Sequence, residues 1–401
     1  MATKSSFRLT QSFKEFFENE RAGAYVLIMC TIISLAIANT AFGPSYVKFF
    51  HSYAGPLSVE HWINDGLMAI FFLLIGLELK REILIGELSD LKKALLPVFA
   101  ALGGMFAPAG IHFLLNNGTA TQAGVGIPMA TDIAFAVGVL ALLGDRIPAS
   151  LKVFLVALAV IDDLGAIIVI AVFYTAELST LYLLGALAMV GFLFALGRVF
   201  KVMSLIPYLI GGAIMWYLML KSGVHATIAG VLLGFVIPFS TKSEDAESPS
   251  HRLEHILHRP VAFVILPIFA LANTCLIIGS DWAAGLLSPN SLGIMLGLGV
   301  GKPLGIFLFA FTVAAIGICR LPLDLNWKHI IGAGMLGGIG FTMSIFITNL
   351  AFTGKPDMID ASKMAIFIAS VFSALAGLFW LKLFGAPNEG DFDMETMDFE
   401  D

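Results

Sequence analysis

Charged residues are scarce in this sequence, making up 13% of its 401 residues. A soluble domain carries charge on roughly a quarter of its residues, so the composition excludes an ordinary soluble protein. Polar stretches long enough to form a separate soluble domain are also lacking. With 58% hydrophobic residues and a mean hydropathy of +0.90, the chain is predicted to be a polytopic all-α membrane protein.

Cysteine is nearly absent as well. Cys30, Cys275 and Cys319 lie in apolar runs without CxxC spacing, which favours packing roles over redox or metal roles. The first 23 residues contain several glutamates and no short basic stretch ahead of an apolar one, so we expect no cleavable signal peptide.

Long apolar runs recur along the chain and predict about twelve transmembrane helices. The predicted spans lie near residues 24–41, 63–79, 94–115, 125–143, 151–174, 181–196, 206–220, 225–239, 262–278, 291–316, 330–350 and 364–383. This divides the chain into an N-terminal segment (1–23), a transmembrane domain (24–384) and an acidic tail (385–401) that we expect to be disordered.

The positive charges support an even number of spans. Eighteen of the 23 lysines and arginines fall on the side of the N-terminus, against four on the other side (Lys48, Lys221, Lys355 and Lys363), and Lys302 lies inside a span. Positive charge favours the cytoplasmic side, so both termini are predicted to be cytoplasmic. The longest polar connector, residues 240–259, is then predicted to be a cytoplasmic loop.

Four ionisable residues remain near the centres of predicted spans: Asp132, Asp162, Asp163 and Lys302. A charged side chain at the bilayer centre costs about 2.5–3.5 kcal/mol to insert on translocon-based scales, and such residues are by default candidates for function. Three carboxylates and one ammonium from separate spans can neutralise one another only if those spans pack together. The alternative for this set, and for Lys302 in particular, is a structural ion pair between helices.

Asp162 and Asp163 are adjacent, so they lie about 100° apart around a helix axis. One can face a cavity while the other faces a neighbouring helix, and Lys302 is the obvious partner for the second role. The whole cluster should titrate as a coupled unit.

Two predicted spans appear interrupted in their sequence pattern. Pro128 removes a backbone donor just before Thr131 and Asp132, and five glycines fall between residues 332 and 340. Interrupted helices leave unpaired N–H and C=O groups, which Asp132 and Lys302 respectively could compensate. Broken spans at corresponding places in two halves of a chain indicate the substrate site of a secondary transporter. Spans three to five would correspond to spans ten to twelve as inverted repeats, each triplet with its break in the middle span.

Several motifs together resemble one family over nearly the whole chain. They are WINDGLMAIFFLLIGLELKRE at 62–82, PMATDIAFAVGVLALLGDR at 128–146, ALAVIDDLGAI at 157–167, LKSGVHATIAG at 220–230, RLEHILH at 252–258, GKPLGI at 301–306 and GIGFTMSIFI at 338–347. On these residues the chain resembles the NhaA family of bacterial sodium/proton antiporters. The resemblance implies two crossing discontinuous helices and a transporter, not an enzyme, in the bacterial inner membrane.

The resemblance also implies an activity and roles for the buried residues. It implies electrogenic export of Na⁺ or Li⁺ in exchange for a larger number of protons by alternating access, without a cofactor. Asp163 would be the principal cation and proton carboxylate, with Asp162 as its partner and Lys302 as the ion pair of Asp162. Asp132 and Thr131 would lie where the broken spans cross. Carboxylates, a hydroxyl and freed carbonyls are the oxygen ligands that a small hard cation requires.

The family loses activity at acidic pH, which points to a second group of residues. The candidate pH-response residues are Glu78, Arg81, Glu82, Glu254, His255 and His258 at cytoplasmic span ends, with His225 at the outer end of span eight. The alternative is that arginine and histidine there only set topology or contact lipid headgroups. The family further implies a homodimer, with contacts from residues 51–60, in contact with membrane lipids and not nucleic acid. The tail has no counterpart in the family pattern.

Other functions predict different residues. A sodium-coupled symporter for organic anions, on a related inverted-repeat fold, would need anion-binding groups beyond Lys302. An intramembrane aspartyl protease would need GxGD within a span, whereas the only Gly-Asp near a span, Gly144-Asp145, lacks the first glycine. A passive channel would need a repeated filter or a ring of charge, and neither is present in the sequence.

Overall fold

The computed structural model describes residues 11–174, 178–240, 248–279 and 282–386. The predicted acidic tail therefore lies outside the described residues except for its first two positions, and so do the first ten residues. Within the described ranges the regular structure is almost entirely helical, which confirms the predicted fold class.

The elements follow one another as consecutive helices with one small hairpin. In chain order they are α1 (Gln11–Ala38), α2 (Gly43–His51), β1 (Tyr53–Ala54), β2 (Leu57–Ser58), α3 (Val59–His61), η1 (Trp62–Leu67), α4 (Met68–Leu84), η2 (Glu87–Ser89), α5 (Leu91–Asn116), η3 (Gln122–Met129), α6 (Ile133–Ala141), η4 (Gly144–Arg146), α7 (Ala149–Phe173), α8 (Thr180–Arg198), α9 (Ile206–Ser222), α10 (Ile228–Val236), α11 (Pro249–Pro260), η5 (Val261–Ile265), α12 (Leu266–Asn273), α13 (Trp282–Leu286), α14 (Pro289–Leu296), η6 (Gly297–Gly301), α15 (Lys302–Ala315), α16 (Trp327–Gly337), α17 (Phe341–Ala351) and α18 (Pro356–Phe384).

Seven described helices are long and apolar enough to cross a membrane, or up to nine if each of two bent helix pairs forms one span. The chain is thus a multi-pass membrane protein, and the count of twelve stays a prediction. Helices α4 and α9 have 17 residues each and α10 has nine, and none of them is among these seven. Helix α4 continues directly from α3 and η1.

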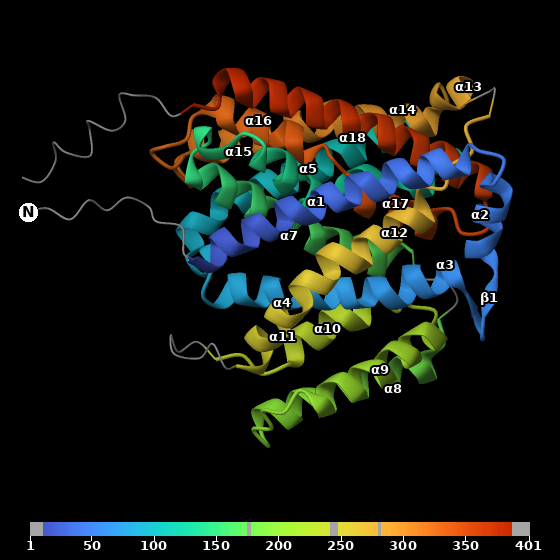
Figure 1. The fold of residues 1–401 in the computed structure, drawn as a ribbon. Helices are drawn as coiled ribbons and strands as arrows, with labels where there is room; N and C mark the ends of the chain where they lie inside the picture. The colour runs from blue at the N-terminus through green and yellow to red at the C-terminus, as the bar shows by residue number, and fades with distance from the viewer. Residues whose placement is uncertain (1–10, 175–177, 241–247, 280–281, 387–401) are drawn as a thin grey trace, which may run out of the picture.

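The helices are arranged with α8 and α9 along one edge of the molecule and α5, α15, α16 and α18 along the opposite edge (Figure 1). Helix α4 lies between the two edges and packs on α10, and α5 packs on α15. The second contact is very close, because a Cβ atom on Gly103 would lie 2.1 Å from the carbonyl oxygen of Gly305. Glycine at both positions therefore brings α15, and with it Lys302, against α5.

Two features differ from the sequence-based expectation. The second half of the 240–259 connector is not a loop, because α11 begins at Pro249, is capped by Ser248, and continues through η5 into α12. Because the sequence of α11 is polar, it was expected to form a connector and not a helix. The segment between the first two predicted spans contains a two-stranded antiparallel hairpin, in which Tyr53 pairs with Ser58 and Gly55 has a φ of +73°.

Candidate functional site

Two interrupted helices meet in the interior. The first interruption separates η3 from α6 at residues 130–132, and the second separates α16 from α17, which are bent by 46°. They touch directly, since the backbone N–H of Asp132 donates to the carbonyl oxygen of Ile339 at 2.7 Å. The Thr131 Oγ1 atom lies 2.9 Å from the carbonyl oxygen of Gly337. Each interruption thus satisfies backbone groups that the other leaves unpaired.

Asp132 caps the second half of both interrupted helices. One carboxylate oxygen accepts from the backbone N–H of Phe135 at 3.0 Å, in the first turn of α6. The other accepts from the backbone N–H of Thr342 at 2.9 Å and from its hydroxyl, in the first turn of α17. Asp132 is 2% exposed. A carboxylate at two helix N-termini is stabilised by both helix dipoles, so Asp132 has a structural reason to be there.

Lys302 pairs with Asp162, as the sequence analysis expected. Its Nζ atom lies 2.8 Å from Asp162 Oδ2, and neither side chain is exposed. The ammonium also donates to the carbonyl oxygen of Met129, at the end of η3. Lys302 begins α15 directly after the π-helical segment η6, and such local widening of a helix is frequent at functional sites. The Thr131 Oγ1 atom lies 2.7 Å from the same Asp162 oxygen, so its one proton serves either Asp162 or Gly337.

Asp163 stands apart from these contacts. It is fully buried, and neither carboxylate oxygen has a hydrogen-bond partner among the described residues. The second oxygen of Asp162, Oδ1, is unpartnered in the same way. A buried carboxylate without partners is costly as a bare anion, so this position favours binding of a proton or a cation. The two neighbouring carboxylates are thus divided by their surroundings into one bound to Lys302 and one open to an ion.

Five of the seven candidate pH-response residues come together where α4 and α11 pack. Arg81 Nε lies 2.8 Å from Glu254 Oε1 and Arg81 Nη1 lies 2.8 Å from Glu82 Oε1. His258 Nε2 lies 4.0 Å from Glu78 Oε1. Glu82 lies beside Arg81 on α4, so the Arg81–Glu254 pair is the contact that joins α4 to α11.

The remaining two candidates lie outside this cluster. His255 is on the exposed face of α11. His225 lies in the connection between α9 and α10, where its Nε2 atom is 2.8 Å from the carbonyl oxygen of Tyr174 at the end of α7. The structure therefore separates His225 from the α4–α11 cluster.

Two groups at the site lie outside the sequence-based prediction. Thr342, which contacts Asp132, lies directly after the glycine-rich run, and a hydroxyl in the first turn of a restarted helix is a signal that was available. The Met129 carbonyl that accepts from Lys302 has no side-chain signal. Its role follows only from the tertiary structure, in which the end of η3 at Met129 lies beside the start of α15 at Lys302.

A buried carboxylate pair, a buried ammonium and two interrupted helices in contact are the features expected of a multi-pass membrane transporter. A family model described as Na⁺/H⁺ antiporter 1 matches residues 14–381, and the chain belongs to this family. The Na⁺/H⁺ antiporter NhaA of Dechloromonas aromatica is 66% identical over 377 residues, covering 94% of this chain and 97% of the relative.

Further relatives agree. The Na⁺/H⁺ antiporter NhaA of Cytophaga hutchinsonii is 60% identical, covering 94% of this chain and 96% of its own length, and that of Vibrio campbellii is 50% identical, covering 91% and 93%. These names describe Na⁺/H⁺ exchange and offer no support for the organic-anion symporter.

Proposed function

We propose that this protein exports Na⁺ or Li⁺ in exchange for a larger number of protons across the bacterial inner membrane, with both termini in the cytoplasm. The observation that carries the proposal is Asp163, a buried carboxylate whose oxygens are unpartnered beside a second carboxylate already paired with Lys302. A proton or a Na⁺ ion can each neutralise Asp163. Since one group cannot hold both, binding of one ion releases the other.

The ligands on offer suit a small hard cation. Asp163, the free oxygen of Asp162 and the hydroxyl of Thr131 are oxygen donors from two adjoining segments, α7 and the interruption between η3 and α6. Oxygen-only ligation is typical of hard cations, which soft sulfur ligands bind poorly. Na⁺ and Li⁺ are here the transported substrates, and the proposed transport needs no cofactor.

An exchange of more than one proton requires a second group that releases a proton. We assign the release of this second proton to the Asp162–Lys302 pair. When Asp162 also binds a cation through Oδ1, its electrostatic attraction for the Lys302 ammonium weakens. Lys302 can then release a proton. Two protons moving against one Na⁺ carry net charge, so the exchange is electrogenic. Alternating access of the site to the two sides would couple the fluxes.

Exchange in everted membrane vesicles tests the function. Wild-type protein should collapse a preformed proton gradient when Na⁺ or Li⁺ is added, and Asp163→Asn should abolish this collapse. Asp357→Asn, an exposed aspartate in the first turn of α18, is the matched control and should exchange normally. Normal exchange by Asp163→Asn would overturn the assignment of the ion-carrying residue.

A second measurement tests electrogenicity. In proteoliposomes, an imposed membrane potential should drive Na⁺ uptake or release in the direction set by its sign. Transport that neither responds to a potential nor generates one would refute the proton excess.

We further propose that the protein forms a homodimer through the hairpin segment. Tyr53 in β1 is 80% exposed and Phe49 in α2 is 59% exposed, so two large aromatic side chains are available for contact with a second copy. Deletion of the hairpin should convert the detergent-solubilised protein to a monomer by light scattering. A monomeric wild type would contradict this proposal.

A further inference from the structure

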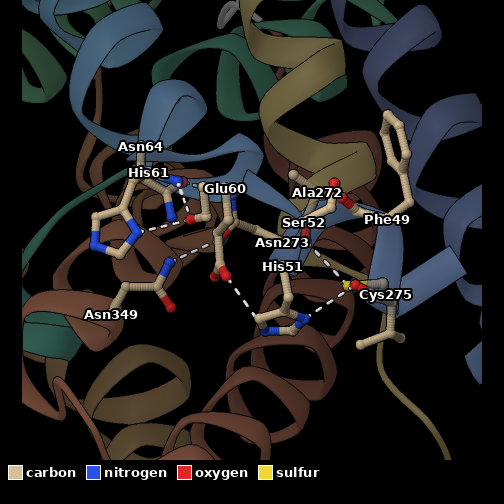
Figure 2. Close-up of polar contacts among 12 residues, drawn as sticks. Phe49, His51, Ser52, Glu60, His61, Asn64, Ala272, Asn273, Cys275 and Asn349 are labelled. Carbon is tan, nitrogen blue, oxygen red and sulfur yellow. Dashed lines mark hydrogen bonds and ion pairs between the residues drawn. The ribbon is translucent and has the colours of Figure 1, made fainter. Parts of the chain in front are cut away.

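Three asparagine side chains from three helical segments form a hydrogen-bonded chain at the end of the molecule that carries the hairpin (Figure 2). Asn273 is the central member. Its Nδ2 atom donates to Asn64 Oδ1 at 2.8 Å, and its Oδ1 atom accepts from Asn349 Nδ2 at 2.6 Å. The same Nδ2 atom also donates to the carbonyl oxygen of Phe269 at 3.0 Å. Asn273 is fully buried, so its amide makes its hydrogen bonds to protein groups and not to solvent.

One end of the amide chain belongs to the helix that forms the ion site. Asn349 lies two turns beyond Thr342 on α17, about 10 Å along the helix axis. Thr342 in turn contacts Asp132. The two turns of α17 between Thr342 and Asn349 should move as one rigid unit. A displacement of Asn349 would therefore also displace Thr342 and alter its contact with Asp132.

The other two members belong to a different packed group of helices. Asn64 lies in η1, which continues into α4, and Asn273 is the last residue of α12, which continues from α11. At the far end α4 is joined to α11 by the Arg81–Glu254 ion pair and to α10 through Lys80, whose Nζ atom donates to the Phe235 carbonyl at 2.9 Å. The amide chain therefore connects the ion-site helix to the group of α4, α10, α11 and α12.

Between the ion site and the amide chain, the contact between α17 and α4 is apolar. The rings of Phe72 on α4 and Phe346 on α17 lie 5.4 Å apart between their centroids. Two apolar surfaces can slide or separate without leaving unpaired polar groups. The amide chain is thus the directional part of the contact, the part that specifies how α17 sits against α4 and α12.

Amides suit a contact that opens and closes. A hydrogen bond between two neutral groups contributes little net free energy, because water replaces it when the groups separate. A buried ion pair in the same place would resist opening. We propose that Asn64, Asn273 and Asn349 form a gate on the hairpin side, in which Asn273 and Asn349 act as positioning residues. The gate holds α17 against α4 and α12 while the ion site is closed to that side, and it breaks when the site opens there.

This inference rests on the alternating access proposed above. The test uses full-length protein in proteoliposomes, with the apparent KM for Na⁺ measured separately on each side of the membrane. Asn349→Ala removes the donor to Asn273 and should favour the form open to the hairpin side. The apparent KM on that side should fall by up to about five-fold, the equivalent of one neutral hydrogen bond, with little change on the opposite side.

Matched variants separate a gate from a general loss of stability. Thr353→Ala is the control, because the Thr353 hydroxyl, two residues past the end of α17, bonds the backbone carbonyls of Asn349 and Leu350 and no side-chain amide of the gate. Asn273→Ala should reproduce Asn349→Ala, and the double variant should add little, since both remove the same bond. Asn349→Gln, which keeps an amide donor, should partly restore the wild-type KM. A purely structural role would instead lower the maximal rate and leave the ratio of the two KM values unchanged.

A native thiol next to the gate offers a second readout. Cys275 follows Asn273 by two residues, is half-buried, and donates from Sγ to the Ala272 carbonyl at 3.0 Å (Figure 2). With Cys30 and Cys319 replaced by serine, a membrane-impermeant maleimide on the hairpin side should label Cys275 faster in Asn349→Ala than in the Thr353→Ala control.

The possible failures are distinguishable. Unchanged KM values on both sides and unchanged labelling in the asparagine variants, with normal exchange by the wild type, would overturn the gate alone. Absence of Na⁺/H⁺ exchange in the wild type would overturn the proposed function instead.

Discussion

The Lys302 ammonium and the Asp162 carboxylate form an ion pair 2.8 Å apart in which neither side chain is exposed to solvent. Removing one partner leaves the other as an uncompensated buried charge. Lys302→Met should therefore destabilise the protein by about 3–5 kcal/mol. Adding Asp162→Asn should recover part of that loss, because the remaining carboxylate charge is then gone. Melting temperatures of the single and double variants in detergent measure the coupling, and strictly additive effects would contradict the pairing.

Asp132 caps two helices at once, so its loss should affect both. Asp132→Ala removes hydrogen-bond acceptors from α6 and α17 and should cost about 2 kcal/mol, close to the sum of two helix caps. Thr342→Val keeps the backbone donor and removes only the hydroxyl, so its cost should be smaller. Unfolding titrations in denaturing detergent compare the variants. Equal stability of Asp132→Ala and wild type would show that the caps contribute nothing.

Competition between Na⁺ and protons at Asp163 predicts the pH dependence of binding. As pH falls, protons occupy the carboxylate and the apparent Kd for Na⁺ rises. In the range where the site is mostly protonated, the rise is about tenfold per pH unit for one displaced proton and about a hundredfold for two. Equilibrium binding of radioactive Na⁺ to purified protein measures this slope. A Kd that does not vary with pH would mean that the two ions do not share the site.

The Arg81–Glu254 pair allows a test of the pH-response cluster. Its side chains are 29% and 11% exposed, so the pair is only partly shielded and its coupling should be about 1 kcal/mol or less. We expect Arg81→Gln and Glu254→Gln each to shift the pH profile of exchange while leaving the maximal rate near wild type. Arg252→Gln, at an exposed position of α11 outside the candidate set, is the control and should not shift it. A profile unchanged in both charge variants would assign the cluster to topology or packing alone.

The part of the site that the sequence predicts best is the part with the highest cost of burial. Asp132, Asp162, Asp163 and Lys302 are recognisable because an ionisable residue in an apolar run has few explanations. The pairing of Lys302 with Asp162 was also predictable, since it is the one ammonium at that depth. By contrast, Asn64, Asn273 and Asn349 sit at ends of apolar runs, where an asparagine is unremarkable. No spacing in the sequence relates them.

Secondary structure shows the same division. The apolar runs predicted most helices, but α11 was predicted as a loop because its sequence is polar. It forms a helix because one face, with Leu253 and Glu254 buried, packs against α4. The hydropathy pattern of residues 249–260 gives little information about α4, the helix that α11 packs against, because α4 lies far away in the sequence.

The sequence alone determined that this is a membrane protein, that it carries charge in its interior, and that two of its spans are interrupted. The first two follow from the cost of polar groups in an apolar medium, and the third follows from the weak helix-forming tendency of Pro128 and of the glycine run at 332–340. Only the tertiary structure decided which backbone groups each interruption satisfies in the other, why Asp163 remains unpartnered while Asp162 does not, and that three amides join α17 to α4 and α12. These are contacts between residues tens to hundreds of positions apart, and their geometry depends on how whole helices pack.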